Sequence, residues 1–70
     1  MKLCELIDER LMDKDMSKPE LAWRTYVSTV AAYKWTQGKT IPSPVSTVII
    51  CDELDITPEE WFAALRETVA

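Results

Sequence analysis

The stretch "SKPELAWRTYVSTVAAYKWTQG", residues Ser17–Gly38, decides how the chain folds, because it interrupts an apolar pattern with a short polar patch and then resumes it. The first apolar run holds Leu21 and Ala22, and the second holds Val27, Ala32 and Trp35. This spacing predicts two short helices that cross at a sharp angle. Such a corner presents one of its helices outward, toward a partner.

The first helix of this corner has a clear start signal. Ser17 is the predicted N-cap, Glu20 lies three residues later as in a capping box, and Pro19 takes an early helical position where its missing N–H costs nothing. We expect this helix to end near Thr25.

The second helix of the corner is bounded by Ser28, a second N-cap candidate, and by Gly38, which suits a left-handed C-terminal cap. Nothing between Val30 and Gln37 stops a helix. A helix of about nine residues is therefore expected here.

Apolar residues at helical spacing predict a further helix on each side of the corner. In the preceding helix they are Leu3, Leu6, Ile7 and Leu11, which end near the charged turn of residues 13–15. The following helix begins at Pro44 or Val45, after the loop "KTIPSP", and continues to Leu54. Its expected core side consists of Thr47, Val48, Ile50, Cys51 and Leu54.

The segment "DITPEEW" repeats the start signal, with Thr57 as cap and Pro58 in the first turn, and predicts a last helix that ends near Val69. Its apolar face holds Trp61, Phe62 and Leu65. No strand pattern, internal repeat or long linker is present. The sequence therefore predicts an all-α fold and one domain over residues 1–70.

The composition is that of an ordinary globular domain, with 47% hydrophobic and 29% charged residues. No apolar run is long enough to span a membrane and no secretion signal is present, so we expect a cytoplasmic protein without a membrane partner. Because the chain has no histidine and its cysteines, Cys4 and Cys51, lie far apart, no metal or other cofactor is expected. We expect two reduced thiols, with Cys51 buried as a small apolar residue.

The distribution of charge favours a phosphate-facing side more than the net charge of −4 does. Residues 1–15 sum to −2 and residues 41–70 sum to −5. Between them, residues 16–40 carry Lys18, Arg24, Lys34 and Lys39 against Glu20 alone, which gives +3. A basic segment between two acidic ones is typical of a protein with one side directed at nucleic acid, although solvated helix positions would give the same count.

The span from Leu3 to Leu65 resembles the five-helix DNA-binding domain of the phage-repressor and Cro family of helix-turn-helix regulators, also called the XRE family. The stretch "MSKPELAWRTYVSTVAAYKWTQGKTIPS" matches the family pattern without a gap, and "ELDITPEEW" follows where the family has a leucine, a short turn and a polar cap. The resemblance implies a compact five-helix lambda-repressor-like domain whose helix-turn-helix motif covers about residues 17–38.

The resemblance also implies which residues contact double-stranded DNA. The start of the first motif helix touches a phosphate in such domains, which falls on Lys18 here. The recognition helix, third in the chain, reads base edges in the major groove from Ser28, Thr29, Val30, Tyr33 and Lys34. In such domains the residues just past the recognition helix contact the phosphates of the DNA backbone. In this sequence they are Gln37, Lys39 and Thr40. Trp35 is expected in the core.

Four positions depart from the family pattern. The turn residue is Tyr26 where the family has glycine, and since this position favours a positive φ, we expect strain of about 1 kcal/mol or more. Within the recognition helix, Ala32 stands where the family has a larger, branched aliphatic residue. Trp23 or Tyr26 is expected to fill the space that the smaller side chain leaves. The buried ion pair of many relatives is replaced by Leu11 and Thr36.

The resemblance implies a sequence-specific transcriptional regulator, repressor- or Cro-like, of a phage, prophage or other mobile element. The alternative is a protein-binding helix-turn-helix module, anti-repressor or antitoxin-like, that no longer binds DNA; the acidic net charge and Tyr26 favour it. An enzyme is not expected, because the chain lacks histidine and has one glycine, which leaves little for acid–base or phosphate chemistry.

Apolar residues left outside the expected core predict a homodimer. Val45 and Ile49 stand one turn apart on a face expected to be solvated, and Phe62 and Arg66 are expected nearby on the last helix. A small two-fold interface through these residues would space two recognition helices about 34 Å apart and form on DNA, although isolated surface apolar residues are also common.

Overall fold

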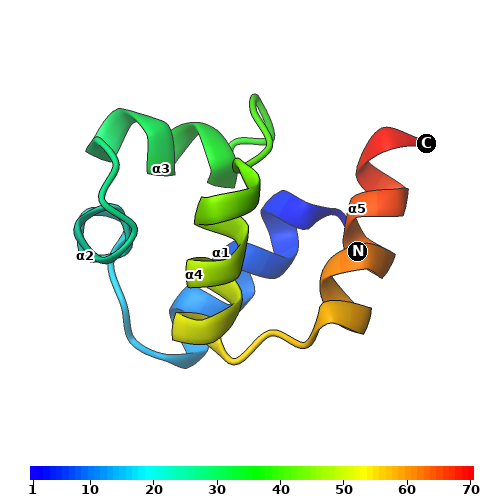
Figure 1. Ribbon diagram of the computed structural model, residues 1–70, viewed down its shortest axis with the longest axis horizontal. Coiled ribbons are helices and arrows are strands. Elements are labelled where there is room, and N and C mark those ends of the chain that lie inside the picture. Colours follow the sequence, from blue (N-terminus) through cyan, green and yellow to red (C-terminus); the bar gives the residue numbers. More distant parts are fainter.

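Five α-helices and no strand make up the computed structural model, which describes residues 1–70 (Figure 1). They are α1 (Leu3–Asp13), α2 (Lys18–Arg24), α3 (Thr29–Thr36), α4 (Pro44–Leu54) and α5 (Pro58–Val69). The prediction of an all-α fold is confirmed, and each helix lies where the sequence places it, although α3 is eight residues long. None of the helices combines the length and apolar character that crossing a bilayer requires.

Hydroxyl side chains cap four of the five helices. In each, the oxygen accepts a hydrogen bond from the backbone N–H three residues on: Ser17 from Glu20, Ser28 from Ala31, Ser43 from Ser46, and Thr57 from Glu60. The reciprocal bond of a capping box forms at α5, where the Glu60 carboxylate accepts from the Thr57 N–H at 3.0 Å. The capping box predicted at α2 is wrong, because the Glu20 carboxylate accepts hydrogen bonds from Arg24 instead.

Four helices are followed by a residue with positive φ, and only one of the four is glycine. These residues are Asp15, Tyr26, Gly38 and Asp55. After α2, Tyr26 has φ 60°, its N–H donates to the Trp23 carbonyl, and the Val27 N–H donates to the Ala22 carbonyl at 3.0 Å. This is a Schellman motif. The positive φ values expected at Tyr26 and Gly38 are confirmed.

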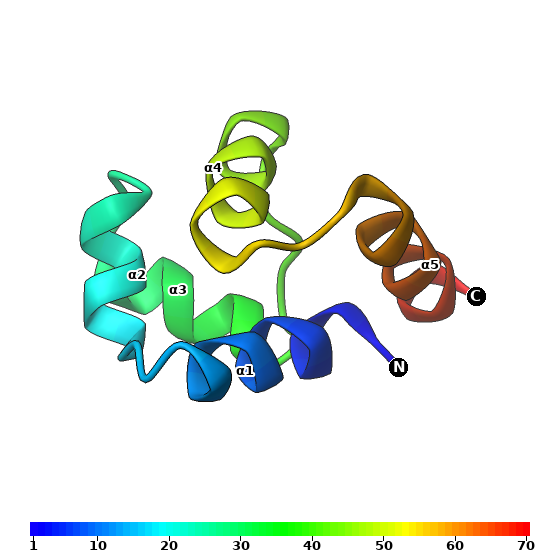
Figure 2. The same cartoon turned by 90° about the horizontal axis from the view of Figure 1, so that it is seen from below.

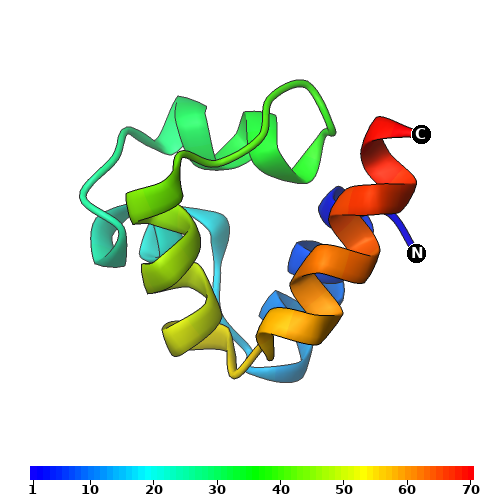
Figure 3. The ribbon, with the colours of Figure 1, turned by 45° about the vertical axis from the view of Figure 1, so that its right-hand side comes forward.

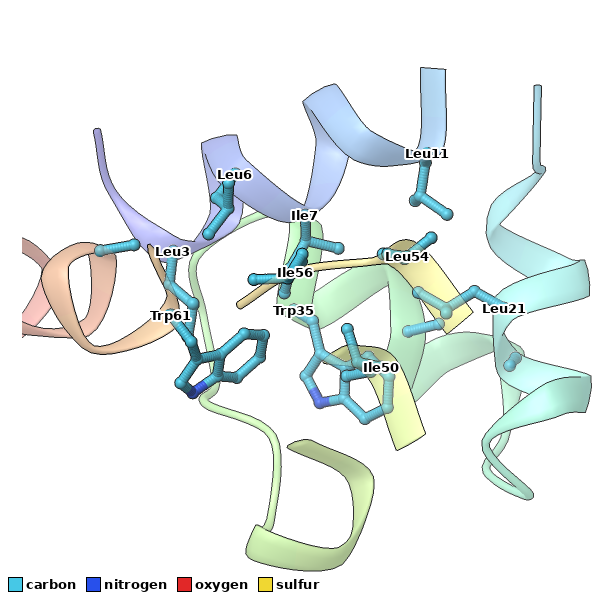
Figure 4. Packing of buried hydrophobic residues seen from close by; sticks show 13 residues of the cluster. Leu3, Leu6, Ile7, Leu11, Leu21, Trp35, Ile50, Leu54, Ile56 and Trp61 are labelled. Atoms are coloured by element: carbon cyan, nitrogen blue, oxygen red, sulfur yellow. The ribbon is translucent and has the colours of Figure 1, made fainter. Parts of the chain in front are cut away.

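The core draws its 13 buried apolar residues from all five helices and from the α4–α5 connection. Helix α1 packs against α3, α4 and α5, and Figure 2 shows it along the lower edge of the molecule, below α4 and with α5 to one side. In the close view, the indole rings of Trp35 and Trp61 lie on the core side of α1, near Ile7 and Leu3 (Figure 4). Trp35 is 6% exposed, which confirms that it is a core residue.

The buried side of α4 differs from the expected one. Ser46, Ile50 and Leu54 are buried at strict four-residue spacing, Thr47 and Cys51 are half-buried, and Val48 is 69% exposed. The prediction is therefore correct for Ile50 and Leu54, wrong for Val48 and incomplete without Ser46. Cys51 is only partly covered, and both cysteines are free thiols.

Both aromatic residues that are candidates to fill the space beside Ala32 lie on the surface. Trp23 is 80% exposed and Tyr26 is 89% exposed, so neither fills space beside Ala32. That expectation is wrong because α2 packs extensively against α3, and buried Ala22 and Ala32 let two helix backbones come close without a larger residue. On α5, Phe62 is 56% exposed, whereas Trp61 and Ala64 are buried.

Candidate nucleic-acid interface

Helix α3 turns one face toward the core and the opposite face toward solvent. Its buried residues are Ala32 and Trp35. Its exposed residues are Thr29, Val30, Tyr33, Lys34 and Gln37 at the helix end. Figures 1 and 3 show α3 along one edge of the molecule with no other element on its outer side. The residues expected to read base edges therefore share one accessible surface.

The turn before α3 is fixed by buried and satisfied groups. Thr25 is 3% exposed, and its hydroxyl donates to the carbonyl of Leu21 at 2.8 Å and lies 3.2 Å from that of Ala22. Val27 packs against the core. Ser28 then caps α3 by accepting the Ala31 N–H, which leaves its own hydroxyl proton free to donate outward. The start of α3 is thus held in one orientation.

Lys18, the first residue of α2, reaches α3. Its ammonium lies 5.2 Å from the centroid of the Tyr33 ring. An ammonium at this distance is attracted by the negative face of an aromatic ring. The structure therefore brings Lys18 next to the outer face of α3, as a shared phosphate and base surface requires.

The segment after α3 is also exposed. Gln37 caps the helix, Gly38 takes φ 75°, and the Lys39 N–H donates back to the Lys34 carbonyl at 3.0 Å. Lys39 and Thr40 are both exposed. The backbone hydrogen bond keeps Lys39 against the last turn of α3.

Three of the five positive side chains elsewhere in the molecule, and the N-terminal amine, form ion pairs with carboxylates. Arg10 pairs with Glu60, Lys14 with Asp55, Arg24 with Glu20 and Glu53 at 2.8 and 2.7 Å, and the N-terminal amine with Glu67. In contrast, Lys18, Lys34 and Lys39 take part in no ion pair. The remaining unpaired cations, Lys2 and Arg66, lie on α1's cap and on α5.

The chain around α3 contains no carboxylate at all. From residue 21 to residue 51 the sequence has neither Asp nor Glu. The lysines of α3 and of the following loop therefore have no acidic neighbour along the chain. The net charge of −4 comes from the flanking segments, not from this surface.

Ion pairs that join the helices also shift pKa values. Hydrogen bonds from Arg24 to Glu53, which tie α2 to α4, and to Glu20 raise the pKa of the Arg24 guanidinium. The pKa of Glu60 falls below its ordinary value because its carboxylate accepts the Thr57 N–H and a hydrogen bond from Arg10. Burial, with a smaller contribution from Asp52, raises the pKa of the Cys51 thiol.

The residues expected at a dimer interface fall into two groups. Phe62 and Arg66 line one shallow depression on α5. Val45 is 72% exposed, but Ile49 is half-buried rather than solvated, and it lies one turn before Glu53, on the flank of α4 that faces α2.

Val48 of α4, which the sequence pattern predicts in the core, is exposed and lines the same depression as Phe62. Val48, Cys51, Trp61 and Phe62 line one apolar depression. In the sequence, the buried side of α4 is marked by the four-residue spacing of Ser46, Ile50 and Leu54, a signal that is weak because it begins with a polar residue.

Comparison with protein-family models, with curated proteins and with solved structures finds no match. No group of three or more His, Cys, Asp or Glu side chains lies close enough together to hold a metal ion. Every buried side-chain nitrogen and oxygen atom has a hydrogen-bond partner. The outer face of α3, with the unpaired lysines around it, is the candidate functional surface.

Proposed function

We propose that this protein is a DNA-binding transcriptional regulator with a lambda-repressor-like fold, in which α2, the turn and α3 form the helix-turn-helix motif. The observation that carries the proposal is the set of three unpaired lysines, Lys18, Lys34 and Lys39, around the exposed helix α3, which itself lies in the acid-free stretch of residues 21–51. Binding to DNA is largely the neutralisation of phosphates by such cations. A repressor- or Cro-like role in a phage, prophage or other mobile element, in the cytoplasm, suits so small a domain.

The side chains of α3 suit the reading of base edges. Lys34 has donors for guanine O6 and N7, Val30 is 63% exposed and apolar enough to pack on a thymine methyl, and Thr29 has a hydroxyl for either a base or a phosphate. Lys39 and Thr40, which follow the helix, would contact phosphates of the DNA backbone. One lysine, Lys34, would then contact a base, and two, Lys18 and Lys39, would contact phosphates. Such an interface would contribute more to the positioning of α3 on the duplex than to the selection of a sequence.

Two copies of the domain would bind two half-sites, one for each recognition helix, about 34 Å apart. Phe62 and Arg66 on α5 are the strongest candidates for the contact, and Val48 belongs beside Phe62. Ile49 is a weaker candidate because it is half-buried and lies on the flank of α4 that faces α2. Val45 is weaker as well, because it lies one turn before Ile49 on the same flank. The duplex would supply the high local concentration that so small an interface needs.

One observation favours the alternative, a protein-binding module that does not use DNA. Trp23 and Tyr26 are almost fully exposed and flank an open depression that the Arg24–Glu53 ion pair also lines. Exposed aromatic residues are enriched at the energetic centres of protein interfaces. A regulator and a protein-binding module differ in how their binding depends on salt.

The test is a salt titration of binding to a labelled random-sequence duplex. Each neutralised phosphate contributes about −0.9 to the slope of log affinity against log salt, so the two lysines assigned to phosphates, Lys18 and Lys39, predict a slope of about −2 per domain. The double variant Lys18→Gln/Lys39→Gln should remove most of that slope. Binding without a salt slope, or no binding, would favour the protein-binding module.

A matched control separates the surface from the total charge. The variant Lys2→Gln/Lys14→Gln makes the same change in net charge on exposed residues outside the proposed surface. It should keep the wild-type slope. An equal loss in both double variants would mean that binding follows net charge alone and that α3 has no special part in it.

A further inference from the structure

We propose that Tyr33 is a positioning residue that holds the ammonium of Lys18 for a DNA phosphate, and that it does not read a base. This inference rests on the proposed function and assigns a role within the same surface. The geometry that carries it is the contact between the two helices of the corner, in which the Lys18 ammonium lies 5.2 Å from the Tyr33 ring centroid.

The surroundings of Lys18 leave the ring as its partner. No carboxylate pairs with Lys18, although Arg10 and Lys14 each have one and Arg24 has two. Lys18 is nevertheless half-buried, whereas Lys34 on the same surface is exposed. A lysine that is partly covered without an ion pair is held by packing and by the ring face, within the distance of about 6 Å at which this attraction acts.

The contact leaves the ammonium chemically free. An ammonium has three N–H donors, and a ring face takes none of them in a conventional hydrogen bond, so they stay available for phosphate oxygens. A lysine side chain on the surface loses rotamer freedom when it binds. Because Tyr33 already restricts the Lys18 side chain in the free protein, less rotamer freedom remains to be lost when Lys18 binds a phosphate. Tyr33 thereby couples a backbone contact on α2 to the orientation of α3.

The ring of Tyr33 is correspondingly less suited to a base. Tyr33 is 39% exposed, the least exposed of the apolar and aromatic residues on the outer face of α3, where Val30 is 63% exposed. Its hydroxyl forms no hydrogen bond within the protein, but its ring lies against Lys18. Thr29, Val30 and Lys34 remain as the residues that reach into the groove.

The contact itself is tested in the free protein. The ring current of Tyr33 should move the ε-methylene proton resonances of Lys18 upfield from those of Lys34 and Lys39. Tyr33→Phe keeps the ring and should keep the shift, whereas Tyr33→Leu keeps apolar bulk and should lose it. Thermal melts confirm that each variant is folded. Unshifted Lys18 resonances in the wild-type protein would overturn the inference.

The role in binding is tested with several duplexes of different sequence. Tyr33→Leu should weaken binding to every duplex by about two- to fivefold, the size expected for one exposed cation–π contact, and Tyr33→Phe should bind as the wild type does. Lys18→Met should weaken every duplex and flatten the salt slope by about one. In the Lys18→Met protein, Tyr33→Leu should have no further effect.

The outcomes separate this inference from the proposed function. A loss confined to duplexes with one particular base pair, or an undiminished effect of Tyr33→Leu without Lys18, would show that Tyr33 reads a base and would overturn the inference alone. An equal loss in Tyr33→Phe would assign the effect to the hydroxyl and also overturn it. A folded protein with the Lys18 shift that binds no duplex would overturn the proposed function and this role together.

Discussion

Replacing Tyr26 by glycine should stabilise the protein. Tyr26 has φ 60°, a left-handed conformation that costs a residue with a Cβ atom about 1–2 kcal/mol. Glycine has no such cost, but it gives the unfolded chain more freedom, which offsets about 0.5–1 kcal/mol. The Tyr26 ring is 89% exposed, so little packing is lost. The net gain is about 0.5–1 kcal/mol, which in a domain of this size raises Tm by about 2–8 °C.

The assay is thermal unfolding followed by circular dichroism, with two control variants. Tyr26→Ala removes the ring but keeps a Cβ atom, so its Tm should stay close to that of the wild type. Trp23→Gly makes the same kind of change at an exposed position inside α2, where glycine lowers stability by about 1 kcal/mol. If Tyr26→Gly melts no higher than Tyr26→Ala, the turn is not strained and the reasoning fails.

Four further changes test other parts of the account. Lys34→Ala should cost about 1–3 kcal/mol of binding and relax the preference at one base pair, and an equal loss at all sequences in a competition assay would assign it to a phosphate. Ile50→Ala should lower the free energy of unfolding by about 2–5 kcal/mol while Val48→Ala changes it by less than about 0.5 kcal/mol, and similar values in urea titrations would refute the observed side of α4. Because the folded-state pKa of Glu60 is lowered, its stabilisation is complete above its ordinary pKa of 4.5 and is lost as pH falls through the lowered value. The Tm difference between wild type and Glu60→Gln should therefore shrink as the pH is lowered from 7 to 2.5, and a constant difference would contradict this. Phe62→Ser should leave the melt nearly unchanged yet remove cooperative binding to a duplex with two half-sites, and retained cooperativity would place the dimer contact elsewhere.

Helix positions and ends were predictable from the sequence because their signals are local. Ser28 and Thr57 each satisfy a backbone N–H within their own helix, and such caps depend on three or four consecutive residues. The turn at Tyr26 was predictable as well, since the resemblance places a positive φ there. At α2 two local interactions compete for the Glu20 carboxylate. Arg24 lies four residues after Glu20 and draws its carboxylate away from the cap.

Packing between helices was less predictable. The buried side of α4 begins at Ser46, a small polar residue that gives no apolar signal, and Val48 looks like a core residue although it faces solvent. The contact between Lys18 and Tyr33 depends on the crossing of α2 and α3, which the spacing of residues along one helix does not specify. For the same reason the lysines of the proposed surface could be named from the sequence, but not their lack of carboxylate partners.

The most direct test of the proposed function is selection of bound sequences from a random pool of duplex DNA. If the protein is a helix-turn-helix regulator, successive rounds should enrich one short half-site repeated with two-fold symmetry, with centres about 34 Å or ten base pairs apart. Lys34→Ala should lose the preference at one position of that half-site. A pool that stays unenriched with folded protein would contradict the claim that α3 reads DNA.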